Sequence, residues 1–238
     1  MTTPPTATLA DALLGPVLRA DAARPLLTYY DDATGERVEL SGTTLANWAA
    51  KTANLLREEL GVAPGDRVAV LLPAHWQSVA VYLGVWWCGA VVDDDSPSVA
   101  FCTADRLTQV PDVPEVVVLS LDAFGRGVAD LPLGVTDYAS TVRVHGDAFA
   151  ATRMDPSSPA LAQRSIGQVL TAARDSAARQ GFTAQDRVLS QSDWATPAQL
   201  VDGLLAVLAA GASLVQVAHP DEDALTRRVS TERVTLVR

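Results

Sequence analysis

Two pairs of neighbouring residues could do chemistry, because each combines a polar or titratable group with an indole ring. His75 and Trp76 follow a short apolar run, and Asp193 and Trp194 hold the matching place after a later run. An imidazole can transfer a proton, a carboxylate can bind a cation, and indole rings line apolar pockets. We therefore interpret these four residues, with Asp93, as a possible ligand cleft. Core packing and helix capping are the alternative roles.

Three consecutive aspartates, 93–95, could hold Mg²⁺ or Ca²⁺ through their oxygens. Adjacent side chains in a strand or turn point in different directions, so three neighbours rarely converge on one ion. We expect a solvated turn there and no metal site. His145 and His219 have no serine, cysteine or carboxylate at a recognisable catalytic spacing, so we assign them no role.

The elements that would position these residues form an internal repeat. The stretch 61–92 returns in altered form at 181–217, with an offset of 120 from Asp66 to Asp186 and of 122 from Gly89 to Gly211. The difference indicates a two-residue loop insertion. An amphipathic stretch precedes each copy, at 44–60 and at 165–180, so the full unit is helix, strand, helix, strand.

The repeat predicts an α/β fold of two similar helix-strand-helix-strand halves with mainly parallel sheets and right-handed crossovers. We place the halves at 1–130 and 131–238, packed as one compact domain. Other strands are expected at 25–30 and 37–40, which form a hairpin, and at 99–102, 115–119, 141–145 and 233–238. Any ligand cleft should lie outside the carboxyl ends of the parallel strands.

Composition excludes several classes of partner. The formal charge is −10 with no basic run, so we expect no nucleic acid. The start of the chain lacks a signal peptide, and no apolar run reaches the roughly 18 residues of a spanning helix. We therefore expect a cytoplasmic protein that does not associate with a membrane. Cys88 and Cys102 lie in apolar surroundings and should be buried, inert thiols. Lys51 is the sole lysine.

The two copies resemble the N-terminal region of the adenylate-forming, or AMP-binding, enzymes, which include acyl-CoA synthetases and the adenylation domains of peptide synthetases. The first copy reads GVAPGDRVAVLLPAHWQSVAVYLGVWWCGAVV, and the second contains a DRVL strand and a helix ending in LAAGASLV. The resemblance implies activation of a carboxylate with ATP. It also implies a loop rich in Ser, Thr and Gly that cradles the phosphates with its N–H groups and a lysine.

That loop belongs before the helix at 165, where residues 147–164 contain neither glycine nor lysine. Ser41-Gly42-Thr43-Thr44 matches the heart of the loop but precedes the first helix of the first copy, so we interpret it as a helix cap. The chain also ends before the family's later nucleotide-binding segments and its C-terminal domain with a second lysine. Lys51 can replace neither lysine, so the resemblance implies the fold and argues against the activity.

We therefore expect a catalytically incomplete relative without enzymatic activity or cofactor, kept as a binding or assembly module. One alternative is an acyl- or carboxylate-binding component, or an ATP-dependent acyl-activating one, that needs a separate partner subunit. An enzyme with unrelated chemistry at the same cleft is a third. The helices at 76–88 and 198–210 are apolar nearly all round and need cover, which predicts a homodimer or an unidentified protein partner. The small-molecule ligand stays unknown.

Overall fold

A computed structural model of the protein describes residues 7–110 and 112–238, and its contacts divide the chain into two units. The first contains Ala46–Leu72, Gln77–Val169 and the segment that ends at Asp11; the second contains Ala12–Leu45, Pro73–Trp76 and Leu170–Arg238. A division between residues 130 and 131 falls inside the first unit. The reason is that strands before and after this point pair in one sheet.

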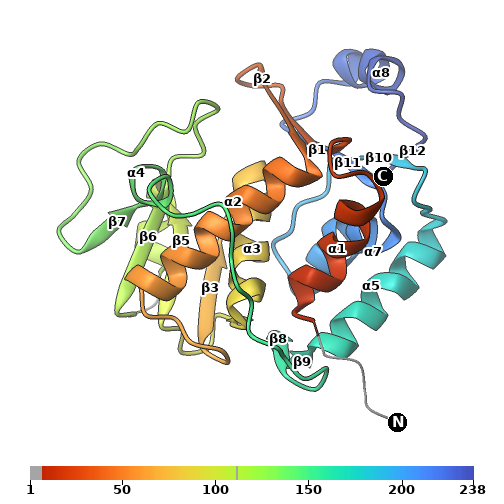
Figure 1. Cartoon of the computed structure of the whole chain (residues 1–238). Coiled ribbons are helices and arrows are strands. Elements are labelled where there is room, and N and C mark those ends of the chain that lie inside the picture. The colour runs from red at the N-terminus through yellow and green to blue at the C-terminus, as the bar shows by residue number, and fades with distance from the viewer. Residues whose placement is uncertain (1–6, 111) are drawn as a thin grey trace, which may run out of the picture. The chain divides into compact units, whose positions relative to one another are not determined.

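The first unit is built on a seven-stranded sheet of order β7-β6-β5-β3-β4-β8-β9 (Figure 1). Its strands are β3 (Arg67–Leu71), β4 (Val91–Val92), β5 (Val99–Thr103), β6 (Glu115–Leu119), β7 (Val135–Asp137), β8 (Pro159–Leu161) and β9 (Arg164–Ser165). Neighbouring strands are parallel except for β8 and β9. Strands such as β5, whose five side chains are all buried, need cover on both faces.

Helices supply the first unit's core. They are α2 (Gly42–Asn54), the π-helical η1 (Leu55–Glu59), α3 (Trp76–Cys88), the 3-10 helix η2 (Ala104–Gln109) and α4 (Tyr138–Val142). One cluster joins η1, α3, α4 and alternate residues of β5 and β6: Leu55, Leu56, Val81, Val85, Val99, Phe101, Val117, Leu119, Tyr138 and Val142. Side chains two residues apart in a strand share a face, so this cluster lies on one face of the sheet.

The strand predicted at 141–145 is wrong. Residues 138–142 form α4, because Asp137 caps its start by accepting a hydrogen bond from the Ser140 amide at 2.8 Å. The carbonyl groups that follow are bound by side chains of α2 and η1. Lys51 Nζ donates to the His145 oxygen at 2.6 Å, and Asn54 Nδ2 donates to the carbonyls of residues 146 and 148 at 2.9 and 3.0 Å. The segment thus lies along a helix and joins no sheet.

The second unit is built on a five-stranded sheet of order β12-β10-β11-β1-β2. Its strands are β1 (Pro25–Asp31), β2 (Glu36–Ser41), β10 (Arg187–Ser190), β11 (Ser213–Ala218) and β12 (Leu236–Val237). The predicted hairpin is confirmed as the antiparallel pair β1 and β2, and the other neighbours are parallel.

The second unit also holds α6 (Pro197–Leu200), the π-helical η3 (Val201–Leu205), α7 (Ala206–Ala210) and α8 (Glu222–Thr231). Like α2 and α3, the helices α1 (Leu9–Asp21) and α5 (Ile166–Gln180) have residues in both units. The sequence analysis did not predict α8. Asp221 caps it, accepting from the Ala224 amide at 2.8 Å. Through Leu225 and Val229 the helix packs on the sheet face of Leu189 and Val215.

The repeat persists in individual hydrogen bonds. The Asp66 carboxylate accepts from the Ala63 amide at 2.8 Å, and the Asp186 carboxylate accepts from the Thr183 amide at 2.7 Å. Arg67 pairs in register with Val91 of β4, as Arg187 pairs with Ser213 of β11. Gly89 and Gly211 end the crossover helices with φ of 77° and 72°, a left-handed conformation that favours glycine. The predicted α/β class of two similar, mainly parallel halves is confirmed.

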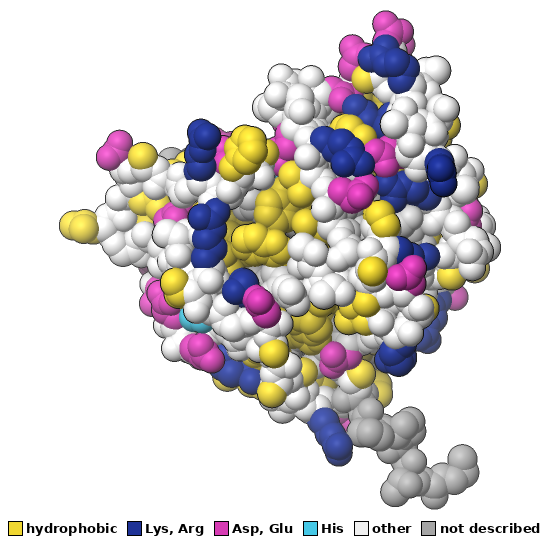
Figure 2. All heavy atoms as spheres, turned by 45° about the horizontal axis from the view of Figure 1, so that its top comes forward, with side chains coloured by type: hydrophobic (Ala, Val, Ile, Leu, Met, Phe, Trp, Pro, Cys, Tyr) yellow, Lys and Arg dark blue, Asp and Glu magenta, His cyan; other side chains and the backbone are white. Residues whose placement is uncertain are grey.

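The surface agrees with the composition. On the face drawn in Figure 2, basic and acidic side chains are interspersed, and no basic face of the kind that binds nucleic acid is seen there. Within residues 7–110 and 112–238, no helix is both long and apolar enough to cross a membrane. Four of the α3 side chains that led us to expect a covering partner, Val79, Val81, Leu83 and Val85, are fully buried in the single chain. They therefore no longer argue for a partner.

Candidate functional site

His75 and Trp76 lie together in a buried polar cluster of the second unit. His75 Nε2 is 3.5 Å from Glu36 Oε1, and Trp76 Nε1 donates to the same oxygen at 3.3 Å. The imidazole meets the Tyr29 ring edge-on, with 4.4 Å between ring centroids. Burial lowers the pKa of His75, opposed by the Glu36 carboxylate. This contact pattern is that of packed core residues.

Asp93 belongs to the first unit and lies beside a guanidinium group. Arg67 Nε is 3.7 Å from Asp93 Oδ2, and Arg67 NH1 is 2.9 Å from Asp95 Oδ2. Within the described part of the chain, no three His, Cys, Asp or Glu side chains are grouped so that they could hold a metal ion. Asp93 and Asp95 therefore lie beside the Arg67 guanidinium.

Asp193 and Trp194 are adjacent in sequence but differ in surroundings. Asp193 is exposed and lines a cavity of about 300 Å³. Trp194 is buried, and its indole nitrogen has no hydrogen-bond partner among the residues described. That nitrogen lies 3.0 Å from the position that a Cβ on Gly203 would take, so a larger residue at this position would crowd the indole. Asp193 therefore belongs to the candidate site because it lines this cavity.

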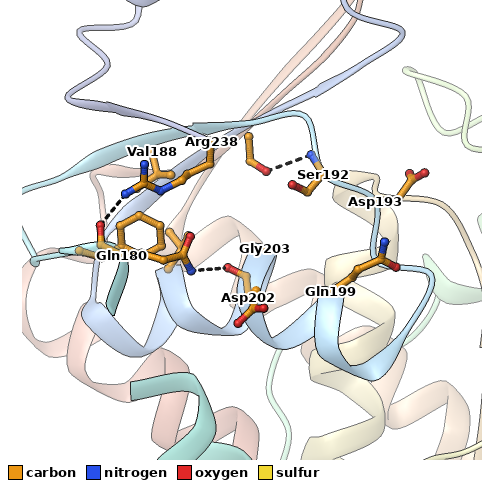
Figure 3. Close-up of a pocket in the computed structure, with 11 residues that line it drawn as sticks. Gln180, Val188, Ser192, Asp193, Gln199, Asp202, Gly203 and Arg238 are labelled. Atoms are coloured by element: carbon orange, nitrogen blue, oxygen red, sulfur yellow. Dashed lines mark hydrogen bonds between the residues drawn. The ribbon is translucent and has the colours of Figure 1, made fainter. Parts of the chain in front are cut away.

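The cavity lies between β10, the end of the chain and the crossover helix of the second copy (Figure 3). Its lining residues are Gln180, Phe182, Val188, Ser190, Ser192, Asp193, Gln199, Asp202, Gly203, Val207 and Arg238. Figure 3 shows Arg238 and Gln180 on one side and Asp193 and Gln199 on the other. Arg238 NH2 donates to the Gln180 carbonyl at 2.6 Å, and its guanidinium lies 5.6 Å from the Phe182 ring centroid.

In the first unit, the positions equivalent to several cavity-lining residues belong to the packed core. With the offsets of 120 and 122, Gln180, Phe182, Val188, Ser190, Ser192 and Val207 match Leu60, Val62, Val68, Val70, Leu72 and Val85, all of which belong to or pack against the first core cluster. The register of the neighbouring strands matches Arg238 with Phe101. Polar side chains at three of these positions and an arginine at a fourth replace apolar ones, so the second unit is hollow where the first is packed.

A π-helical turn borders the cavity. Asp202 and Gly203 lie in η3, within a crossover helix whose counterpart α3 is α-helical throughout. Such turns arise from single-residue insertions and are frequent at functional sites. The sequence analysis found Asp193 but missed Ser190, Ser192 and Arg238. A position-by-position comparison of the two copies is the signal that would have found them.

The place expected for a phosphate loop holds a closed turn before α5. The Ser157 amide donates to Asp155 Oδ1 and the Ser158 amide to the Asp155 carbonyl, both at 2.8 Å. The Gly167 amide donates to the Pro156 carbonyl at 2.9 Å. Hydrogen bonds from the Ser157 side chain and backbone hold the pKa of Asp155 below its ordinary value. The turn thus binds its own carboxylate through the Ser157 N–H group.

The tetrapeptide Ser41-Gly42-Thr43-Thr44, which matches the heart of the family's phosphate loop, is confirmed as a helix cap. Ser41 Oγ accepts a hydrogen bond from the Thr44 amide at 3.1 Å, at the start of α2. The side chains that would offer hydroxyls to a phosphate are therefore bound to each other, since Ser41 Oγ and Thr44 Oγ1 also lie 3.0 Å apart.

The comparisons identify the class of protein. The sequence profile of the AMP-binding enzymes matches residues 19–110. The Brucella canis acyl-CoA synthetase superposes with a TM-score of 0.79 and 16% identity over 100% of this chain and 48% of that one. Acetoacetyl-CoA synthetase from Streptomyces lividans gives 0.79 and 20% over 98% and 42%. The fold is that of the N-terminal region of adenylate-forming enzymes, and the chain spans about half the length of these solved relatives.

A relative that matches over its full length shows the family to which the chain belongs within this class. The "TIGR03089 family protein" of Mycobacterium tuberculosis (strain ATCC 25618 / H37Rv) is 59% identical over 246 residues, which cover the whole of both chains. The chain belongs to the TIGR03089 family.

Proposed function

We propose that this protein is a non-catalytic relative of the adenylate-forming enzymes that serves as a binding or assembly module. The observation that carries this proposal is the turn at Asp155. A phosphate loop works by leaving several backbone N–H groups free to meet phosphate oxygens. Here the amides of Ser157 and Ser158 are bound to Asp155, whose negative charge would repel a phosphate.

The sole lysine supports the same proposal. Lys51 Nζ donates to the carbonyl of His145 at 2.6 Å and pairs with Asp147 at 2.7 Å. Both contacts fasten the segment after α4 to α2, so the ammonium group is already engaged in a structural role. The buried, free thiols of Cys88 and Cys102 suit a reducing compartment, so we propose a cytoplasmic setting.

Titration calorimetry with Mg·ATP tests the proposal. We expect no binding in the micromolar range, and no carboxylate-dependent exchange between ATP and pyrophosphate. The Asp155→Asn variant is the informative companion, because it removes the charge while keeping a side chain that can cap the turn. Micromolar binding of Mg·ATP to the parent protein, or measurable exchange, would overturn the proposal.

A second candidate is an acyl- or carboxylate-binding component that acts with a separate partner subunit. The observation in its favour is Arg238, because a guanidinium that lines a cavity can bind a carboxylate. Purification from the native host distinguishes the two candidates. A co-purifying subunit that restores carboxylate-dependent exchange favours this one, whereas purification without exchange favours the non-catalytic module.

A further inference from the structure

An open depression of about 800 Å³ lies on the second unit and shares no lining residue with the cavity described above. It is bordered by β1, β2 and β10 and by the residues that follow α8. Its charged side chains are Arg37, Glu39, Arg187, Glu232 and Arg233. Three guanidinium groups thus share one depression with two carboxylates, in a chain whose formal charge is −10. The depression is therefore locally basic on an acidic protein.

A buried carboxylate fixes two of these guanidinium groups. Glu232 Oε1 accepts from Arg37 Nε at 3.2 Å and from Arg37 NH2 at 2.9 Å, and Glu232 Oε2 accepts from Arg187 NH2. The Tyr30 hydroxyl also donates to Glu232. The Glu232 side chain is only 6% exposed, so its removal from water costs free energy that these hydrogen bonds offset. The result is a pair of arginines that are held in place before any ligand arrives.

Each of the three guanidinium groups keeps N–H groups that bind no residue in the part of the chain that the structure describes. They are NH1 of Arg37, Nε and NH1 of Arg187, and all the guanidinium nitrogens of Arg233. A guanidinium presents its donors in a planar fork that matches two oxygens of a carboxylate or a phosphate. The depression therefore offers several such donors to an oxyanion.

The backbone at Arg233 is unusual for a residue with a side chain. Arg233 follows the last residue of the α8 cap and has a φ of 53°, the left-handed conformation that glycine usually adopts at this position. The turn is fixed by the Arg233 amide, which donates to the Ser230 carbonyl at 3.2 Å, and by the Val234 amide, which donates to the Val229 carbonyl at 2.9 Å. An arginine here costs more than a glycine would. Among the described residues, no hydrogen bond to its guanidinium offsets that cost, whereas a bound anion would.

We propose that this depression is a binding site for a small oxyanion, a carboxylate or a phosphate, which the guanidinium groups of Arg37, Arg187 and Arg233 hold. Glu39 competes with the ligand, since its Oε2 lies 2.8 Å from Arg37 NH2 and 3.7 Å from Arg187 NH2. The site goes beyond the function proposed above and does not depend on it, because the turn at Asp155 belongs to the first unit. We expect a dissociation constant on the order of 1 mM for a small anion, outside the micromolar range of the Mg·ATP test.

Thermal melts at pH 7 test the site, with sodium phosphate and sodium acetate as probes and sodium chloride of equal ionic strength as reference. At about 20 mM, the better probe should raise the midpoint of the parent by about 4 °C. Phosphate also stabilises proteins by exclusion from their surface, so the site is measured by comparing variants. Arg233→Gln should lose more than half of the rise. Arg227→Gln, which removes an exposed arginine of α8 outside the depression, should keep it.

The two probes also distinguish the ligand classes. A larger rise with phosphate assigns the site to a phosphate, and a larger rise with acetate assigns it to a carboxylate. No rise with either probe, or an equal rise in Arg233→Gln and Arg227→Gln, would overturn the proposal.

Removing the competing carboxylate should strengthen binding. Glu39→Gln should lower the dissociation constant of the better probe about threefold, because it takes a negative charge away from Arg37 and Arg187. Glu222→Gln is the matched control, since Glu222 is exposed at the start of α8 and lies outside the depression, and it should leave the dissociation constant unchanged. Arginines with a purely structural role would give no such gain. Equal binding in the two variants would therefore contradict the assignment of Arg37 and Arg187 to the site.

Discussion

Ser190 takes the strand position in the second unit that Val70 takes in the first, three residues after the arginine of the repeated Asp-Arg pair. Val70 is partly buried and packs against the core cluster of its unit, whereas Ser190 is buried and lines the cavity. One framework therefore supports a filled core in one copy and a hollow in the other. Exchanging the two residue types, with Val70→Ser in one unit and Ser190→Val in the other, therefore distinguishes a packed core position from a position that lines a cavity.

The exchange should be asymmetric. Val70→Ser should reduce the free energy of unfolding by about 1–2 kcal/mol, because it removes apolar surface and places a hydroxyl in the core. Ser190→Val should change it by less than about 1 kcal/mol in either direction, because the new methyl groups enter a cavity. Urea denaturation followed by circular dichroism measures both. Equal losses would show that the second unit is packed at position 190 as the first unit is at position 70, which would contradict the cavity.

The sequence predicted an element correctly where the residues that determine it are neighbours along the chain. The repeated Asp-Arg and Gly-Ala pairs predicted β3, β4, β10 and β11 because a buried parallel strand needs only a short apolar run between turn residues. The strand predicted at 141–145 was wrong because the Asp137 cap, a single side-chain bond, starts a helix there.

The candidate site depended on contacts distant in sequence. His219 Nδ1 lies 2.9 Å from Asp31 Oδ1, a pair separated by 188 positions, so no reading of local spacing could give His219 a partner. The cavity was hidden for a similar reason. Ser190 and Ser192 look ordinary at the end of a strand, and only their apolar counterparts in the first copy show that a core has been opened.

Glu232 should dominate the acid stability of the second unit. Burial raises the pKa of this carboxyl, but hydrogen bonds from Tyr30, Arg187 and Arg37 outweigh burial and hold the pKa at about 2, below its ordinary 4.5. A carboxyl whose pKa is lower in the folded state contributes stability that is complete above its unfolded pKa. That contribution should decline as the pH falls from about 4.5 toward about 2, as urea denaturation at a series of pH values would record.

Substitution separates this carboxylate from its neighbours. Glu232→Gln should cost about 3 kcal/mol at pH 7, because it leaves the largely buried guanidinium of Arg187 with only the more distant Glu39 carboxylate, at 3.7 Å. Glu39→Gln is the matched control, since Glu39 contacts the same two arginines from a more exposed position and should cost less than about 1 kcal/mol. Loss of the acid transition in the control variant would contradict the assignment to Glu232.

Lys51 should stabilise the segment that follows α4. Lys51→Met removes the hydrogen bond to the His145 carbonyl and the pair with Asp147. We expect amide hydrogen exchange in residues 143–150 to become about tenfold faster, corresponding to about 1.4 kcal/mol of local opening. Arg174→Met, an exposed substitution in α5, should leave that segment unchanged. Equal exchange in both variants would count against the role of Lys51.

Both cysteines should be unreactive in the native protein. Burial raises the pKa of Cys88 to about 12 and of Cys102 to about 11, so almost no thiolate exists at pH 8. An Ellman titration should find no reactive thiol in the native state and two after unfolding in urea. Val144→Cys, at an exposed position, should add one fast thiol and shows that the assay detects accessible groups. Rapid native labelling of the parent would mean that a buried thiol is reached by opening.

The turn at 93–95 should not bind divalent cations. Arg67 lies 3.7 Å from Asp93 and 2.9 Å from Asp95, so a guanidinium already partners these carboxylates. The exposed pair of Arg67 with Asp95 contributes less than about 1 kcal/mol. Replacing the three aspartates with Asn should therefore alter stability only slightly. Thermal melts with and without millimolar Mg²⁺ or Ca²⁺ should give the same midpoint in the parent and in this variant. A ligand that binds only the folded state must raise the midpoint, so a cation-dependent rise confined to the parent would reveal a metal site there.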